Sequence, residues 1–279
     1  MKILAVGDFH GTFPKKFEDL IKKEKIDLVV SNGDYFPFHY RKIWFKYCYG
    51  TKKELWEIIG KKKYKKLVLK DLKDGENAIK KLNSLPIPII TVYGNIDYTG
   101  KKSDNQEHKV KRKWKWDNQN FFGKIIKKYK NIREFSYSYF KFQNFIFIGT
   151  YGSTNKGDAK SKTYKKNLKK MEKLFDTFKK ENKDGRVIFV GHNVPYNTKL
   201  DKASMKSHET VRGKHLGSKM IRDLIKKYQP LLYLGGHMHE SKGKDKIGKT
   251  ICINSGAVHE GHATIIDFNK SKINKIKFF

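Results

Sequence analysis

Five short motifs contain the residue types that bind divalent metal ions. They are Asp8-Phe9-His10, Gly33-Asp34, Gly94-Asn95-Ile96-Asp97, Gly191-His192 and Gly236-His237-Met238-His239. Carboxylate oxygens, amide oxygens and imidazole nitrogens are the donors that hard and borderline divalent ions accept in proteins. One such motif alone is weak evidence, because Asp, Asn and His also stabilise turns and cap helices. The case for a metal site therefore depends on where the five motifs lie in the fold.

All five motifs follow a short apolar run with the composition of a β-strand. The runs are Ile3–Val6, Asp27–Ser31, Ile87–Tyr93, Arg186–Gly191 and Leu231–Gly235. Open α/β sheets bind their ligands beyond the carboxyl ends of their strands, and the glycines allow the chain to turn sharply there. His237 and His239 are two positions apart, so both project to the same side of an extended segment. Together the motifs contain enough donors for two ions rather than one.

The rest of the chain predicts the elements that hold these motifs. Short β-branched or aromatic runs alternate with lysine-rich amphipathic stretches, a pattern typical of layered α/β folds. Further strands are expected at Glu134–Phe140, Asn144–Thr150, Thr250–Asn254, Ala263–Phe268 and Ile273–Phe278. Helices are expected at Pro14–Lys25, Asp71–Leu85, Lys160–Glu181 and Gly217–Tyr228. We expect one domain of residues 1–279, with insertions near 35–69 and 98–122 that interrupt the alternation and border the site.

Composition excludes several classes of protein. With 38% hydrophobic and 14% aromatic residues the chain can form a substantial core, which excludes a disordered basic tail. Two cysteines, Cys48 and Cys252, are too few for a disulfide framework or a four-thiolate zinc site. Asp8 interrupts the first apolar run too early for a secretory signal, and no run approaches the ~18 apolar residues of a membrane span. We therefore expect a cytoplasmic protein that does not associate with membranes.

The chain carries 62 Lys and Arg against 28 Asp and Glu, a formal net charge of +34. Only six of the basic residues are arginine, the side chain best suited to bidentate recognition of phosphates and bases, and the lysines recur in nearly every polar stretch. This distribution favours a general compositional bias over a dedicated nucleic-acid reader. Around Trp114 and Trp116, basic residues are interleaved with aromatics. That segment could stack bases and neutralise phosphates, or its rings could simply cover one edge of the site.

The order and spacing of the five motifs resemble those of the calcineurin-like metallophosphoesterase superfamily, whose pattern is D-x-H, G-D, G-N-x-D/E, G-H and G-H-x-H. The similarity extends from Asp8 to His239. A narrower branch, the predicted phosphoesterases related to the bacterial cyclic-AMP phosphodiesterase, is resembled by His192-Asn193-Val194-Pro195 and His215-Leu216-Gly217-Ser218. The resemblance implies an α/β fold of two mixed β-sheets packed as a sandwich, with helices on both outer faces.

The same resemblance implies a hydrolase with a dinuclear metal centre. One ion would be held by Asp8, His10, Asp34 and His239, and the second by Asp34, Asn95, His192 and His237, so that Asp34 bridges them. Two ions roughly 3.5–4 Å apart hold a hydroxide of lowered pKa and stabilise the charge of an in-line displacement at phosphorus. Mn²⁺ is favoured, and Fe²⁺, Zn²⁺, Ni²⁺ and Co²⁺ suit the same donors. The expected partner is a phosphorylated small molecule or a nucleotide, and nucleic acid is a further candidate.

The sequence departs from the superfamily pattern at Ile96, where many members have a histidine placed to protonate the leaving oxygen. A general acid contributes about 10²–10⁴-fold to the rate, and it matters most for poor leaving groups. Ile96 therefore favours phosphodiesters or activated esters, unless His208, His215 or His259 replaces the missing acid. Asp97 is expected to orient the nearby asparagine or a histidine. His215 and His259 could equally be hydrogen-bonded surface histidines.

Two other functions are compatible with the same residues. A binding or scaffold protein could keep the fold with weak or no catalysis and use its basic insertions to hold nucleic acid, although seven metal-ligating side chains argue against it. A nuclease would combine the metal chemistry with the positive charge.

Overall fold

The computed structural model describes residues 1–97, 114, 116–117, 119–151, 162–205, 207 and 209–279. His208 and most of the segment 98–122 lie outside the described residues, so the expectations for them stay predictions.

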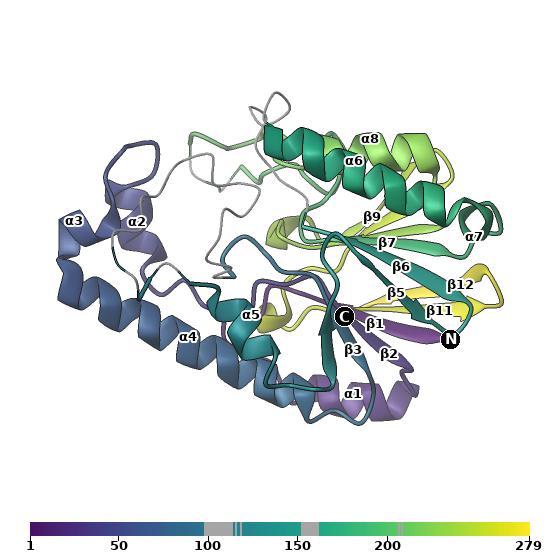
Figure 1. Ribbon diagram of the computed structural model, residues 1–279, viewed down its shortest axis with the longest axis horizontal. Helices are drawn as coiled ribbons and strands as arrows, with labels where there is room; N and C mark the ends of the chain where they lie inside the picture. Colours follow the sequence, from purple (N-terminus) through teal and green to yellow (C-terminus); the bar gives the residue numbers. More distant parts are fainter. Residues whose placement is uncertain (98–113, 115, 118, 152–161, 206, 208) are drawn as a thin grey trace.

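Two six-stranded sheets form the centre of the described structure (Figure 1). The first has the strand order β12-β11-β1-β2-β3-β4, and the second has the order β5-β6-β7-β8-β10-β9. The strands of the first sheet are Lys2–Val6 (β1), Leu28–Ser31 (β2), Ile89–Thr91 (β3), Ile132–Glu134 (β4), Thr264–Asn269 (β11) and Lys272–Phe278 (β12). Those of the second are Tyr139–Phe142 (β5), Phe145–Thr150 (β6), Val187–Gly191 (β7), Leu232–Gly235 (β8), Gly243–Ile247 (β9) and Thr250–Asn254 (β10).

Both sheets are mixed. In the first, β1 to β4 pair in parallel, whereas β11 and β12 are antiparallel additions on one side. In the second, β6, β7, β8 and β10 pair in parallel, and the antiparallel strands β5 and β9 lie at the two edges. The parallel strands of each sheet therefore have their carboxyl ends on the same side. The polar motifs follow the strands there.

Side chains alternate between two hydrophobic layers along the strands. Ile3 and Ala5 of β1 point into a core shared with Ile188 and Val190 of the second sheet. Leu4 points to the opposite side, where the core contains side chains of the outer helices. This period of two, with both faces buried, explains why the central strands read as continuous apolar runs.

Helices cover the outer face of each sheet (Figure 1). On the first sheet they are Lys16–Glu24 (α1), Lys61–Asn83 (α4) and Phe121–Ile126 (α5), and on the second they are Lys162–Thr177 (α6), Lys179–Lys183 (α7) and Lys219–Tyr228 (α8). The short helices Arg41–Tyr47 (α2) and Leu55–Ile59 (α3) lie with the start of α4 beyond the end of the sheets, at the left of Figure 1. The predicted α/β sandwich flanked by helices is confirmed.

Two predictions about elements were wrong, and one strand was not predicted. The run Glu134–Phe140 is not one strand, because a turn in which Tyr137 has φ 55° separates β4 from β5 and sends them to different sheets. The helix expected at Asp71–Leu85 begins ten positions earlier, at Lys61, inside the segment interpreted as an insertion. The polar strand β9, with sequence GKDKI, was missed because it lacks an apolar run.

The ends of helix α8 are explained by the residues at its two termini. The side chain of Ser218 caps α8 by accepting a hydrogen bond from the backbone N–H of Ile221, and the helix ends at Gln229 in a left-handed conformation just before Pro230. Within the described residues, no helix is both long and apolar enough to cross a membrane.

Candidate metal centre

The candidate ligands come from strands that are neighbours in each sheet. Asp8 follows β1, Asp34 follows β2 and Asn95 follows β3, and these three strands are adjacent and parallel. His192 follows β7 and His237 follows β8, which are adjacent in the second sheet. The two sheets are joined at this edge, because the backbone N–H of His237 donates a 2.9 Å hydrogen bond to Asp8 Oδ2. Ligand-bearing loops of both sheets therefore meet at one end of the sandwich.

One group of donors gathers around His239. Its Nε2 lies 3.3 Å from His10 Nε2 and 3.3 Å from Asp8 Oδ1. Ligand atoms of Asp8, His10 and Asp34 lie within 4.8 Å of one another. This side of the centre thus combines two carboxylates with two imidazoles.

A second group gathers around His192. Its Nε2 lies 2.7 Å from Asn95 Oδ1, 3.2 Å from His237 Nδ1 and 3.4 Å from Asp34 Oδ2. Ligand atoms of Asp34, His192 and His237 lie within 4.8 Å of one another. Asp34 is therefore common to both groups, and the structure brings all seven predicted metal-ligating side chains together.

The loops that carry these residues have unusual backbone conformations. Asp8, His10, Asp34 and His237 have φ values of 55°, 44°, 58° and 70°, in the left-handed region that non-glycine residues rarely adopt. Such conformations cost on the order of 1–3 kcal/mol each and concentrate at functional sites. Gly94 is needed for a different reason, because a Cβ at that position would collide with Asp34 Oδ1.

Acceptor atoms face each other at the centre without a proton between them. His192 Nδ1 donates a 2.9 Å hydrogen bond to the carbonyl oxygen of Asn32, so the neutral ring carries a lone pair on Nε2. That lone pair faces Asn95 Oδ1, another acceptor, at 2.7 Å. Asp8 Oδ1 is buried, and among the described residues the polar group that approaches it is His239 Nε2, at 3.3 Å. Acceptors crowded in this way fit a bound cation, so the donor set passes the chemical test for divalent metal ions.

The sequence and the fold identify the family. A family model of calcineurin-like phosphoesterases matches residues 1–241 of the chain. The chain belongs to the calcineurin-like phosphoesterase family. Membership indicates an enzyme that hydrolyses phosphoester bonds with divalent metal ions, and the groups of His and Asp side chains agree with this.

This phosphoesterase is similar in sequence or in structure to several known proteins. An uncharacterised protein of Methanocaldococcus jannaschii is 32% identical over 258 residues, which cover 91% of this chain and 87% of that protein. One crystal structure superposes with a TM-score of 0.70 at 18% identity and covers 100% of this chain and 98% of its own. A dimetal phosphatase from Danio rerio gives a TM-score of 0.54 at 9% identity, covering 97% of this chain and 93% of its own. The two structures confirm the calcineurin-like fold.

Asp8 and Asp34, the two buried aspartates of this phosphoesterase's candidate centre, have opposite pKa shifts. Burial raises the pKa of Asp34 well above its usual value, and the charge of Asp8 raises it further. Burial would also raise the pKa of Asp8, but its interaction with His239 and the charges of His192 and His10 outweigh burial and lower it. Two buried carboxylates side by side repel each other unless positive charge is supplied between them.

Most of the histidines are neutral in the metal-free site. Burial lowers the pKa of His10 to about 4 and that of His237 to about 3, and it also lowers the pKa of His192. His239 is the exception: burial opposes its charge, but the hydrogen-bond interaction and negative charge of Asp8 raise its pKa to about 9. Three of the four imidazoles therefore offer a free lone pair near neutral pH.

Asp97 forms hydrogen bonds with the backbone of the loops after β2 and β3, and not with the side chain of a candidate ligand. Its Oδ2 accepts hydrogen bonds from the backbone N–H groups of Asp34 (2.9 Å) and Gly94 (2.7 Å), and its Oδ1 accepts one from Tyr35 (2.8 Å). We had expected Asp97 to orient the asparagine or a histidine side chain. Among the described residues its hydrogen bonds go to backbone instead, and they fix the loops after β2 and β3 to each other.

The three histidines considered as substitute acids have different positions. His259 adjoins the centre, with its ring centroid 4.7 Å from that of His10 and 5.3 Å from that of His239. His215 has its Nδ1 2.6 Å from Asp201 Oδ1, and no described contact connects it to the donor groups. His208 lies outside the described residues.

Two contributors to the site were not anticipated. Glu260 Oε1 lies 3.5 Å from His239 Nδ1 and 3.7 Å from His259 Nε2, so it lies beside both rings. Asn32 contributes only its carbonyl oxygen, which holds His192. The sequence signal for Glu260 was the dense run Val258-His259-Glu260-Gly261-His262, whereas a backbone carbonyl leaves no sequence signal.

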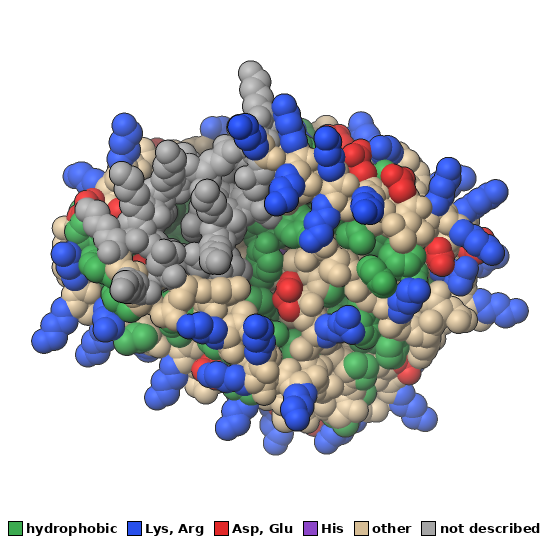
Figure 2. Space-filling model, viewed as in Figure 1, with side chains coloured by type: hydrophobic (Ala, Val, Ile, Leu, Met, Phe, Trp, Pro, Cys, Tyr) green, Lys and Arg blue, Asp and Glu red, His purple; other side chains and the backbone are tan. Residues whose placement is uncertain are grey.

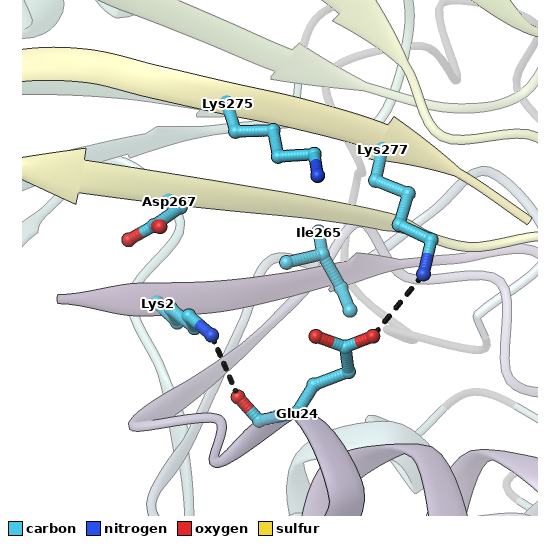
Figure 3. Close-up of a pocket in the computed structure, with 6 residues that line it drawn as sticks. All are labelled: Lys2, Glu24, Ile265, Asp267, Lys275 and Lys277. Atoms are coloured by element: carbon cyan, nitrogen blue, oxygen red, sulfur yellow. Dashed lines mark hydrogen bonds and ion pairs between the residues drawn. The ribbon is translucent and has the colours of Figure 1, made fainter.

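A cavity of about 220 Å³ lies at the opposite end of β1 (Figure 3). It is lined by Lys2, Glu24, Ile265, Asp267, Lys275 and Lys277. Glu24 pairs with two of the lysines there: its Oε1 lies 3.2 Å from Lys277 Nζ, and its carbonyl oxygen accepts a 3.2 Å hydrogen bond from Lys2 Nζ. The cavity includes none of the candidate ligands, so it is separate from the metal centre.

Proposed function

We propose that this protein is a dinuclear metal-dependent phosphodiesterase. The observation that carries the proposal is the position of Asp34, which belongs to both donor groups and so lies where a bridging ligand is required. Asp8, His10, Asp34 and His239 would hold one ion, and Asp34, Asn95, His192 and His237 would hold the other. The Danio rerio phosphatase with this fold is a dimetal enzyme, which supports a centre with two ions.

A pair of divalent ions held by these residues would lower the pKa of a water molecule, making it a nucleophile near neutral pH, and would neutralise charge on the phosphoryl oxygens. The protein's own contribution is to fix the ligands before the substrate binds. Asn32 keeps the lone pair of His192 directed inward, and Asp97 holds the loops of Asp34 and Asn95 together. These contacts lie outside the ligand set, where supporting hydrogen bonds typically change metal affinity by about 10–100-fold.

The preference for diesters follows from Ile96. At the position where many family members carry a proton donor, this side chain is aliphatic, and its backbone N–H donates a 3.0 Å hydrogen bond to Asp34 Oδ1. His215 is held by Asp201 through a 2.6 Å contact, so it is not a ready substitute. Without a strong acid, esters whose leaving group departs unprotonated are hydrolysed best.

We further propose that residues 35–69 and 98–122 border the site within one domain. Arg41 on α2 supports this for the first segment: after burial and the charges of His192 and His239, the charge of Arg41 also lowers the pKa of His237. His39, in the same segment, connects it to α4. One ring nitrogen of His39 contacts Asp71, and the other lies 3.5 Å from Asp74; both aspartates are on α4. The loop after Asp34 is thereby attached to α4, whose first turns form, with α2 and α3, the helical projection at the left of Figure 1.

Nucleic acid is the second candidate substrate or partner, favoured by one group of residues. Lys61 Nζ lies 5.8 Å from the ring centre of Trp56 and 5.6 Å from that of Trp114, and Lys65 Nζ lies 5.5 Å from that of Trp116. Trp114 and Trp116 stack on each other at 5.9 Å. The rings thus hold lysines in place at the projection, although Figure 2 shows Lys and Arg side chains over most of the visible face.

A panel of metals and substrates tests the proposed function. Chelator-treated protein would be reloaded with Mn²⁺, Fe²⁺, Zn²⁺, Ni²⁺ or Co²⁺ and assayed on an aryl phosphodiester, the matching monoester, cyclic nucleotides and single-stranded DNA and RNA. We expect metal-dependent turnover that is fastest on diesters, with Mn²⁺ among the active ions. Faster turnover of the monoester would contradict the diester assignment, and turnover that persists in chelator would contradict the metal centre. We also propose a cytoplasmic location, which fractionation of the source cells would test.

A further inference from the structure

We infer that His259 is an additional metal ligand, on the side of the centre that contains His10 and His239. This inference rests on the proposed dinuclear centre and assigns a ligand outside the seven predicted side chains. One ring nitrogen from each of the three histidines lies within 4.8 Å of one from each of the others. The three rings are mutually tilted, by 53°, 86° and 68°, so none of them stacks face to face on another.

The backbone fixes His259 beside the ligand loop. His259 lies in the short 3₁₀ helix Val258–Glu260, and the N–H of Val258 donates a 2.8 Å hydrogen bond to the carbonyl oxygen of Gly7. The next residue in the loop, Asp8, is itself a proposed ligand. His259 is therefore anchored to the same loop as Asp8.

Hydrogen bonding determines which ring nitrogen is free to coordinate. His259 Nδ1 donates a 2.8 Å hydrogen bond to the carbonyl oxygen of Asp8, because a carbonyl can only accept. The neutral ring then carries its lone pair on Nε2. His192 follows the same pattern, with Nδ1 tied to the carbonyl of Asn32. Metal-bound histidines typically have this arrangement, in which the outer nitrogen is held by an oxygen acceptor.

The surroundings of Nε2 would also be stabilised by a cation. The carboxylate oxygen Oε1 of Glu260 lies 3.7 Å from His259 Nε2, and a lone pair facing a carboxylate is repulsive unless positive charge lies near both. With His259 included, this ion receives three imidazoles, whereas the ion on the other side of Asp34 receives those of His192 and His237. An imidazole-rich site favours ions such as Zn²⁺, Co²⁺ and Ni²⁺ over Mn²⁺.

The test uses Co²⁺, whose visible absorption reports the number and type of its ligands. Wild-type protein and the His259→Ala variant would be titrated with Co²⁺ after chelator treatment. The matched control is His262→Ala, because His262 lies three positions further on, has a similar exposed fraction (30% against 29%) and faces the other oxygen of Glu260 at 3.8 Å. We expect the wild type and the control to bind two ions. His259→Ala should bind one of them at least about tenfold more weakly, with a changed spectrum.

A second measurement does not depend on any variant. In protein labelled with ¹⁵N-histidine, Zn²⁺ should shift the Nε2 resonance of His259 together with the resonances of the predicted histidine ligands. The inference is overturned if that resonance does not move, or if His259→Ala binds two Co²⁺ ions with wild-type affinity and spectrum, as it would if His259 formed an imidazolium pair with Glu260. If wild-type protein binds fewer than two ions, the proposed dinuclear centre itself is wrong, so the two failures are distinguishable.

Discussion

The Nε2 atoms of His10 and His239 lie 3.3 Å apart, although 229 positions separate the two residues in the chain. In the metal-free protein a proton on His239 Nε2 faces both His10 Nε2 and Asp8 Oδ1, each 3.3 Å away. The pKa of His239 is raised to about 9 by Asp8 against the effect of burial, so His239 is protonated near neutral pH, whereas burial lowers the pKa of His10 to about 4. A divalent ion would have to replace that proton.

Metal binding should therefore release protons, and metal affinity should rise with pH. The pKa of His239 is about 9, so His239 holds its proton below that pH. Up to that pH, each increase of one pH unit should strengthen metal binding by up to about tenfold if one proton is released. Calorimetry at pH 7 in buffers of different ionisation enthalpy would count the protons. The variant His215→Ala should behave like the wild type, because its ring is held by Asp201 away from the donor groups. Affinity that does not change between pH 6.5 and 8.5 would contradict this prediction.

Replacing Asp97 with Asn should loosen both ligand loops. The three backbone N–H groups now bound by its carboxylate would face a side chain with one acceptor oxygen and a donor NH₂ group. We expect a loss of about 1–3 kcal/mol in the free energy of unfolding, measured by urea denaturation of metal-free protein. Metal affinity should fall as well.

The control for that variant is Asp27→Asn, because Asp27 precedes β2 and accepts a 2.6 Å hydrogen bond from the backbone N–H of Lys2, at the end of the strand away from the site. It should keep wild-type metal affinity. If Asp97→Asn also kept it, Asp97 would be a structural residue with no influence on the ligands.

Replacing Gly94 with Ala should damage the centre and also reduce stability. The new Cβ would collide with Asp34 Oδ1 and with the backbone nitrogen of Asp34, and so displace the shared carboxylate. We expect turnover on an aryl phosphodiester to fall by about 10²-fold or more, as for a misplaced group at the reacting centre. Gly50→Ala provides the comparison: Gly50 has φ 72° and open space around its Cβ position, so that change should cost stability and leave turnover intact.

The basic projection should contribute to nucleic-acid binding only if its lysines are specially placed. The variant Lys61→Glu/Lys65→Glu changes the charge at the tryptophan rings, and Lys22→Glu/Lys23→Glu makes the same change in charge on α1. If the projection binds single-stranded DNA, the first variant should weaken binding more and reduce its salt dependence more than the second. Equal effects in fluorescence anisotropy titrations would show that only the overall charge matters.

The location of the site was predictable from sequence because it depends on a simple rule. Parallel strands end at a common edge, so Asp8, Asp34 and Asn95 had to lie near one another once β1, β2 and β3 were adjacent. Features that depend on contacts with distant backbone were not predictable. Asp97 binds amides of a loop 62 and 63 positions away, and its motif alone suggested a side-chain partner.

The strand predictions were wrong where the sequence pattern and the tertiary structure conflict. The residues from Glu134 to Phe140 have the composition of one strand, yet Tyr137 turns the chain with a positive φ, which local composition does not reveal. In β9, polar residues occur where pairing with β10 on one side is sufficient to form the strand. Both errors concern edge strands, which are less constrained by burial than the central ones.

The central claim is that two ions share Asp34, and metal analysis of the Asp34→Asn variant tests it most directly. Wild-type protein and Asp27→Asn, reloaded with Mn²⁺ and freed of excess metal, should contain two ions per chain and hydrolyse an aryl phosphodiester. Asp34→Asn should contain fewer than two ions and lose turnover by several orders of magnitude. Two tightly bound ions and unchanged turnover in Asp34→Asn would contradict the account.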